Sequence, residues 1–153
     1  YTSKLGNKVK FINRVASHSE VYNIMSQIDC GIFPARTEGW NLEALELMSC
    51  GKAVIASNTS GHTEFCNDEN SLLVDLEEYE VAYDGKWFHG NKGNWPAITE
   101  SNMQSFSEHL KSVHNSVQSQ SLKINSAGVE TAQTFSWENS AKKIVDYIHG
   151  NKQ

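Results

Sequence analysis

Two glutamates lie on either side of a short segment that has the pattern of a helix start. Glu38 is followed by Gly39, and Asn41 is a residue type favoured at the N-cap position, so Leu42 is predicted to be the first helical residue. Glu46 follows about one helical turn later. The first N–H groups of a helix have no partner within it, and with the helix dipole they favour phosphate. The spacing suits a site for a phosphate and for a group that carries hydroxyls.

Glu46 needs an explanation because the predicted helix is apolar in nearly every direction. Its apolar residues are Leu42, Ala44, Leu45, Leu47 and Met48. Such a helix is expected to be buried, and an ionised carboxylate is costly there unless something bonds it. Two explanations stay open: Glu46 pairs with a basic residue from elsewhere or reaches solvent, or it accepts hydrogen bonds from paired hydroxyls of a ligand. With phosphate at residues 39–42, the second explanation indicates a nucleotide and its ribose.

Short apolar runs alternate with helical patterns around this segment. The runs predict strands at 8–15, 30–35, 53–57 and 71–74. A capping box formed by Ser17 and Glu20 opens a predicted helix over 17–27, and a second helix is predicted over 42–51. Strands separated by helices indicate βαβ units, so we expect an α/β fold with a parallel sheet flanked by helices.

The chain changes character after residue 78. Residues 79–98 form an aromatic-rich insertion with glycine and asparagine, predicted to be a loop pinned by its rings; the alternative is a lid or an acceptor-recognition element. Extra C-terminal helices are predicted within 100–117, 121–133 and 135–150. The last one begins at a Ser136 cap and carries Ala141, Ile144, Val145 and Ile148 on one face.

Composition excludes several classes of function. The net charge is −5 and no Lys or Arg run stands out, which argues against nucleic-acid binding. The three cysteines fit no zinc template and are predicted to be buried thiols in a reducing compartment. The histidines form no close ligand pair, so no metal site is expected. No transmembrane segment or signal peptide is apparent. We expect a cytoplasmic protein, or one at the cytosolic face of a membrane, and a chain that starts at Tyr1 as part of something longer.

Glu38 and Glu46 are similar to the Glu-x7-Glu motif of retaining nucleotide-sugar glycosyltransferases of the large family-four group, which have the GT-B fold. The surrounding segments 22–39 and 46–57 also resemble this family, as does the closing helix. The resemblance implies that residues 1–153 are a single Rossmann-like, nucleotide-sugar-binding domain, the C-terminal half of a GT-B fold. The N-terminal acceptor domain would be a missing partner, together with the basic pair that contacts the phosphates.

The resemblance also implies residue roles. Glu46 would hold the ribose hydroxyls of the donor, and Glu38 would be catalytic, next to the transferred hexose. Diphosphate would bind the N–H groups of Gly39, Trp40, Asn41 and Leu42, and the base would lie beside the turn that contains Arg14 and Val15. The donor nucleotide sugar is then a substrate, and no cofactor is expected.

The chain departs from the family pattern at Asn13, where the family often has glycine. The isolated chain is expected to bind nucleotide weakly and not to turn over. Two alternatives stay open: a non-catalytic nucleotide-binding or interaction module that kept the fold, and a related nucleotide-sugar epimerase, which the Glu-x7-Glu pairing disfavours.

Overall fold

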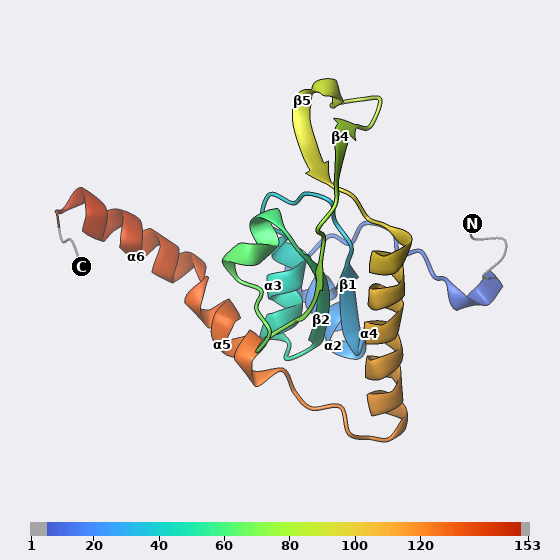
Figure 1. Ribbon diagram of the computed structural model, residues 1–153. Coiled ribbons are helices and arrows are strands. Elements are labelled where there is room, and N and C mark those ends of the chain that lie inside the picture. The colour runs from blue at the N-terminus through green and yellow to red at the C-terminus, as the bar shows by residue number, and fades with distance from the viewer. Residues whose placement is uncertain (1–5, 151–153) are drawn as a thin grey trace.

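The structure is a computed structural model that describes residues 6–150, and it has the predicted α/β class (Figure 1). Three parallel strands form a Rossmann-like sheet in the order β1 (Cys30–Phe33), β2 (Ala53–Asn58), β3 (Leu72–Asp75). The helices are α2 (His18–Gln27), α3 (Leu42–Ser49), α4 (Glu100–Gln118), α5 (Ser126–Thr134) and α6 (Trp137–Ile148), and two 3-10 turns are η1 (Gly6–Lys8) and η2 (Ser60–Glu64). The strands predicted at 30–35, 53–57 and 71–74 are confirmed.

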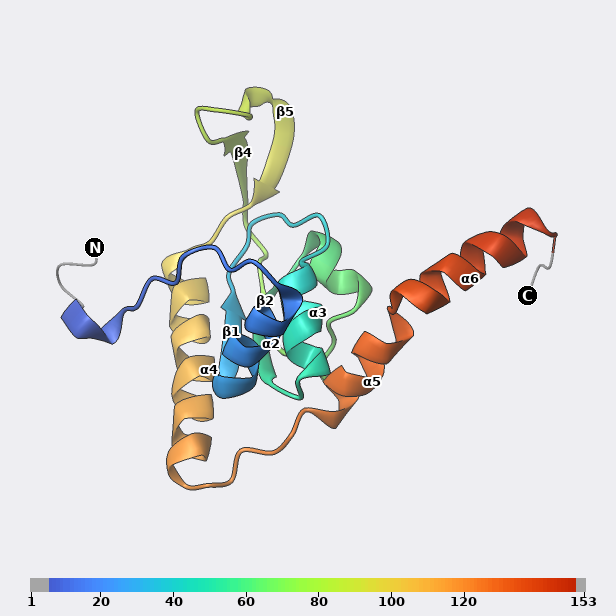
Figure 2. The ribbon, with the colours of Figure 1, turned by 180° about the vertical axis from the view of Figure 1, so that it is seen from behind.

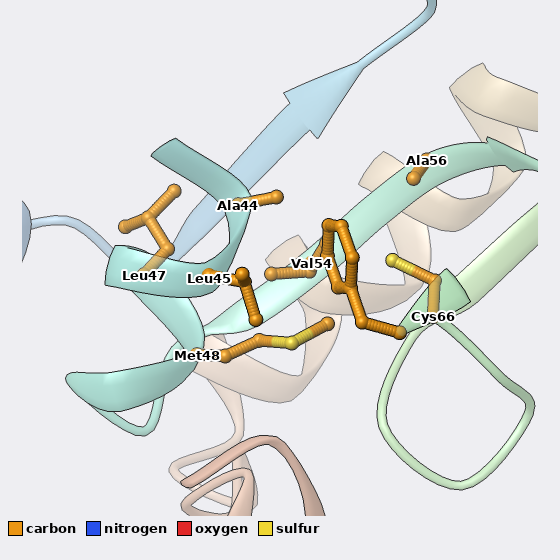
Figure 3. Packing of buried hydrophobic residues seen from close by; sticks show 8 residues of the cluster. Ala44, Leu45, Leu47, Met48, Val54, Ala56 and Cys66 are labelled. Atoms are coloured by element: carbon orange, nitrogen blue, oxygen red, sulfur yellow. The ribbon is translucent and has the colours of Figure 1, made fainter. Parts of the chain in front are cut away.

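Helix α3 covers one face of the sheet. Successive side chains of a strand point to opposite faces, so Val54 and Ala56 of β2 face α3 while Ile55 faces away. Figure 3 shows the resulting cluster, which consists of Ala44, Leu45, Leu47, Met48, Val54, Ala56, Phe65 and Cys66. Helix α3 is thereby fixed against the sheet, and its first turn is held at the carboxyl end of β1.

Helix α4 covers the opposite face of β2 and β3. Ile55, Val74 and Leu76 pack there against Phe106 and Val113 of α4. The sheet is therefore buried on both faces at β2, where the strand residues from Val54 to Ser57 are all buried. This accounts for the run of apolar residues in β2 without alternation, as is typical of parallel sheets.

The strand predicted at 8–15 is wrong. Residues 9–15 form neither helix nor strand, and Phe11 is exposed. The alternation of Val9 and Phe11 with lysines is a strand pattern, but a strand also needs a neighbour for its hydrogen-bond ladder. Here the segment lies along α2 instead, where Lys10–Asn13 line a surface hollow with residues of that helix. The predicted capping box of α2 is confirmed, with Ser17 and Glu20 bonded reciprocally.

The loop predicted over 79–98 is also wrong, because this segment contains an antiparallel hairpin. Strand β4 (Tyr79–Tyr83) pairs with β5 (His89–Pro96), and the two project from the end of the sheet at which β1 stops (Figure 1). The oxygen Oδ1 of Asp84 accepts hydrogen bonds from the backbone N–H groups of Lys86, Trp87 and Phe88, at 2.8, 2.7 and 2.9 Å. That single carboxylate orders the connection between the strands.

The three predicted C-terminal helices are confirmed, and they differ in how they pack. Helix α5 packs against α3, whereas α6 extends away from the body in both views (Figures 1 and 2). The α6 face with Ile144, Val145 and Ile148 exists as predicted, but these side chains are exposed and α6 buries no residue. Within residues 6–150, no helix combines the length and apolar character needed to cross a membrane.

Candidate functional site

The candidate site is formed by the loop between β1 and α3, residues 34–41, which we call the β1–α3 loop. Asn41 ends it as the predicted N-cap of α3, and its Oδ1 accepts the N–H of Ala44 at 3.1 Å. Its φ of 68° lies in the left-handed region, which asparagine tolerates better than most residues. The loop thus turns sharply into the helix, and the first backbone N–H groups of α3 lie at the carboxyl edge of the sheet, where open α/β folds bind their ligands.

A buried histidine fixes the side chain of Asn41. Asn41 Nδ2 lies 2.7 Å from Nε2 of His62, and Nδ1 of His62 lies 2.9 Å from the carbonyl oxygen of Ser57. Because the Ser57 carbonyl can only accept, Nδ1 carries the proton and Nε2 accepts from the Asn41 amide. His62 is completely buried, so this chain of bonds is shielded from water. The helix cap is therefore set from the neighbouring strand β2.

Residues after β2 also hold Glu38. The backbone N–H of Glu38 donates to Oγ of Ser60 at 2.8 Å, and its carbonyl accepts the N–H of Gly61 at 3.0 Å. Gly61 has no room for a side chain, because a Cβ there would lie 2.5 Å from the carbonyl oxygen of Gly39. Two chain segments thus approach at van der Waals distance, and Gly61 is the residue that permits it.

The carboxylate of Glu38 differs from the prediction in one respect. Its Oε1 accepts the N–H of Gly39 at 2.9 Å, so that N–H is not free for a phosphate in this structure. The N–H groups of Trp40, Asn41 and Leu42 have no acceptor within residues 6–150. Three of the four predicted phosphate donors are therefore without an acceptor, and the fourth is occupied by the residue predicted to contact the sugar.

The prediction that α3 is buried all round is wrong. Leu42 is 52 % exposed and Glu43 is exposed, because only one side of the helix contacts the sheet. Glu46 is half-buried and lines a small hollow of 130 Å³ between α2 and α3, together with His18 and Tyr22. Its carboxylate has no ion-pair partner among residues 6–150, and no side-chain oxygen there is both buried and without a hydrogen bond, so the carboxylate reaches solvent. Burial therefore does not demand a ligand for Glu46, although the hollow leaves room for one.

The structure brings some of the predicted residues together. Arg14 is exposed and Val15 half-buried in the segment that leads directly into α2, whose first residue His18 shares the hollow with Glu46. The side chain of Trp40 turns inward and packs between aromatic rings, with centroids 5.6 Å from Phe65 and 5.3 Å from Phe135. Trp40 can therefore offer a ligand its backbone but not its ring.

Four residues that hold the loop were not among the predicted site residues: Ser57, Ser60, Gly61 and His62. The signal that would find them is their position, since Ser57 ends the buried part of β2 and the other three follow that strand, at the edge where β1 also ends. Carboxyl ends of neighbouring parallel strands meet at one edge, so polar and small residues there are candidates for positioning a site. Within residues 6–150, no cluster of three or more His, Cys, Asp or Glu side chains could hold a metal ion.

Comparison with known proteins identifies the family of the chain. Residues 1–83 match the family described as Glycosyl transferases group 1. The match covers more than half of the 153 residues, and the chain belongs to this family. It includes the β1–α3 loop and Glu46 and stops at Tyr83, the last residue of β4.

One relative is much longer than the part of it that aligns with this chain. The chain is 25 % identical, over 147 residues, to the lipopolysaccharide 1,2-N-acetylglucosaminetransferase of Salmonella typhimurium. The alignment covers 72 % of this chain and 38 % of the relative, so the chain spans well under half of the relative's length.

Proposed function

We propose that this chain is the donor-binding part of a retaining GT-B glycosyltransferase, which moves a hexose from a nucleotide diphosphate sugar to an acceptor hydroxyl. The observation that carries the proposal is the open N-terminus of α3. The N–H groups of Trp40, Asn41 and Leu42 have no acceptor in residues 6–150, and Asn41 is locked in place behind them. Such an N-terminus holds phosphate oxygens well.

The two glutamates suit the two ends of the donor. Glu46 lies in the hollow between α2 and α3 and would accept hydrogen bonds from the ribose hydroxyls. Arg14 and Val15, just before α2, would lie beside the base. Glu38 lies in the β1–α3 loop, three residues before the N-cap Asn41, and would contact the hexose. Its bond to the Gly39 N–H would open when the diphosphate takes that donor.

In the proposed reaction the bond between the anomeric carbon and the diphosphate oxygen breaks while the acceptor oxygen bonds to that carbon. The proton of the acceptor hydroxyl passes to the departing diphosphate. The N–H groups at the start of α3 would stabilise the charge that grows on the departing diphosphate. Because they supply this stabilisation from the backbone, we propose that no metal and no cofactor takes part. The acceptor domain and further phosphate-binding cations would come from outside these 153 residues.

The test is calorimetric titration of the chain with UDP, GDP and ADP. We expect one nucleotide to bind, and Glu46→Ala to weaken it about tenfold, or ~1.4 kcal/mol. Glu43→Ala is the matched control, because Glu43 lies on the same helix, is exposed, and carries the same charge. Its removal should leave the affinity unchanged or slightly raised, since a negative charge near phosphate is lost.

Two results would contradict the proposal. Equal effects of Glu46→Ala and Glu43→Ala would show that Glu46 does not contact the ribose. Binding that is insensitive to both substitutions, or to the identity of the base, would favour a non-catalytic module that kept the fold.

A further inference from the structure

We infer that one face of the β4–β5 hairpin binds the acceptor as an oligosaccharide, through two tyrosines. This inference rests on the proposed function, since it names the substrate that the site would glycosylate. Tyr79, Val81 and Tyr83 alternate along β4 and therefore point to the same side of the hairpin. Their side chains are 66 %, 56 % and 64 % exposed. We call this side, with the residues opposite it on β5, the tyrosine face.

The other face of the hairpin is covered by contacts among the hairpin's own side chains. Glu80, Ala82 and Trp95 lie on that face, and the rings of Trp95 and Phe88 pack with centroids 5.3 Å apart. Ala82 is buried, and Nε1–H of Trp95 donates to Oε1 of Glu80 at 3.0 Å. The tyrosine face is therefore the side that remains available.

The composition of the tyrosine face favours a neutral ligand with many hydroxyls. Pro96 lies opposite Tyr79, Asn94 opposite Val81 and His89 opposite Tyr83, so polar groups lie beside Tyr83 and between the two rings. None of these three paired residues is a carboxylate, lysine or arginine. Sugar rings present C–H bonds that pack flat on aromatic rings, and hydroxyls that bond to amides and imidazoles.

The geometry also favours an extended saccharide. Tyr79 and Tyr83 are four residues apart on a strand, which places them about 13 Å from one another along it. Gly90 lies beside Val81, where a Cβ would be 3.4 Å from Val81 Cγ1, so Gly90 itself places no side chain between the rings. The result is an exposed surface with an aromatic ring at each end.

The size of the face argues against a protein partner. A stable interface needs about 800 Å² on each side, and two aromatic side chains contribute about 150–250 Å² each. Even with Val81, the tyrosine face falls short of what a second copy of the chain would need. A short oligosaccharide needs no larger surface than this.

The hairpin is tied to the candidate site by Arg36. This residue lies in the β1–α3 loop, two positions before Glu38. Its Nε is 3.0 Å from Oε1 of Glu80, and its guanidinium lies over the ring of Trp95, 5.7 Å from the centroid. An acceptor on the hairpin would therefore lie next to the loop that carries the proposed catalytic carboxylate.

The test is binding of chitotriose, maltotriose and cellotriose to the 153-residue chain, measured by saturation-transfer NMR and titration. We expect at least one trisaccharide to bind and the double variant Tyr79→Ser/Tyr83→Ser to weaken it roughly tenfold. Tyr79→Phe/Tyr83→Phe keeps both rings and should retain most of the affinity. Tyr147→Ser is the matched control, because Tyr147 is an exposed tyrosine on α6, away from the hairpin.

Each outcome decides the question. No trisaccharide binding, or equal binding by the double serine variant, would overturn the inference, as would equal losses in the serine variant and in Tyr147→Ser. Nucleotide titration of the same variants separates the two proposals. Glu46-dependent nucleotide binding without saccharide binding would remove only the tyrosine face, whereas tyrosine-dependent saccharide binding without nucleotide binding would remove the donor site.

Discussion

At the scale of single residues, the candidate site depends on groups that themselves touch no ligand. Asn41 caps α3 in a left-handed conformation, and its amide orientation is fixed because its oxygen bonds to Ala44 and its nitrogen to His62. His62 in turn bonds to the carbonyl of Ser57. Each member has one orientation that satisfies its neighbours, so the direction of the first N–H groups of α3 is determined inside the protein core.

Replacement of His62 should disrupt the hydrogen bonds that link Asn41, His62 and Ser57, and the cost should exceed that of the lost side-chain volume alone. His62→Ala leaves the Asn41 amide and the Ser57 carbonyl without partners and creates a cavity, so we expect a loss of about 3 kcal/mol in the free energy of unfolding. Urea denaturation measures the effect. His114→Ala, which changes an exposed histidine on α4, is the control and should shift stability by less than ~0.5 kcal/mol. A loss below ~1 kcal/mol for His62→Ala would mean that the chain of bonds contributes little.

At the scale of elements, the β4–β5 hairpin depends on its connecting turn. The pKa of Asp84 is lowered below the ordinary 3.8, above all by the hydrogen bond from the Phe88 N–H and next by that from Lys86. A carboxyl whose pKa is lower in the folded state stabilises that state above its unfolded pKa, and the stabilisation is lost as the pH falls through the folded pKa. The turn should therefore loosen only in acid, below about pH 3.8.

The loosening can be followed by NMR through the amide signals of Lys86, Trp87 and Phe88. In the wild-type chain these three signals should move together as Asp84 is protonated. Asp84→Asn keeps an acceptor oxygen but no titrating group, so its amide signals should not respond over the same range. An identical acid transition in Asp84→Asn would show that another group controls the turn.

The elements also show what sequence reasoning can reach. The strands β1, β2 and β3 and the caps of α2 and α3 were predictable because the deciding signals, apolar runs and capping side chains, are local. The segment 8–15 has an equally good strand pattern, but pairing depends on a neighbour that no local pattern reveals. The hairpin was missed because its glycines and asparagines suggested a loop, whereas Asp84 and the packing of Phe88 on Trp95 order it.

The candidate site also has features that local sequence patterns predict and features that depend on tertiary packing. Asn41 and the start of α3 were predictable from the capping pattern. The glutamates were selected by their spacing, and their roles stay predictions. The exposure of Glu46 was not predictable, because which side of α3 meets the sheet depends on tertiary packing. The contribution of His62 could not be predicted from the sequence either, because its bond to Asn41 joins residues far apart in the sequence.

At the scale of the whole molecule, the described chain has two cores and one helix that belongs to neither. The cores lie on the two faces of the sheet, and α4 also protects the outer edge of β3. Asn102 Nδ2 donates to the carbonyl of Asp75 at 2.9 Å, and Nε2 of His109 lies 3.1 Å from the carbonyl of Leu73. These side chains take the place of a neighbouring strand. Helix α6 takes part in neither arrangement.

The stability of the body should therefore not depend on α6. A chain that ends at Ser136 lacks the whole helix but keeps Phe135, which packs on Trp40. We expect its free energy of unfolding in urea to lie within ~0.5 kcal/mol of the full chain, because α6 buries no residue. Phe135→Ala in the full chain is the control and should cost about 1–2 kcal/mol, since it removes aromatic contacts at the end of α5.

The opposite result would carry equal weight. If the shortened chain loses as much stability as Phe135→Ala, then α6 contributes contacts in solution that the arrangement in Figure 1 does not contain. Sedimentation equilibrium of the full chain then separates the two sources of such contacts. A monomer would mean that α6 folds back on the body, and a concentration-dependent dimer would mean that its apolar face with Ile144 and Ile148 pairs with a second copy. Retained stability with a monomeric chain would mean that α6 adds little to the folding free energy, which then comes from the rest of the chain.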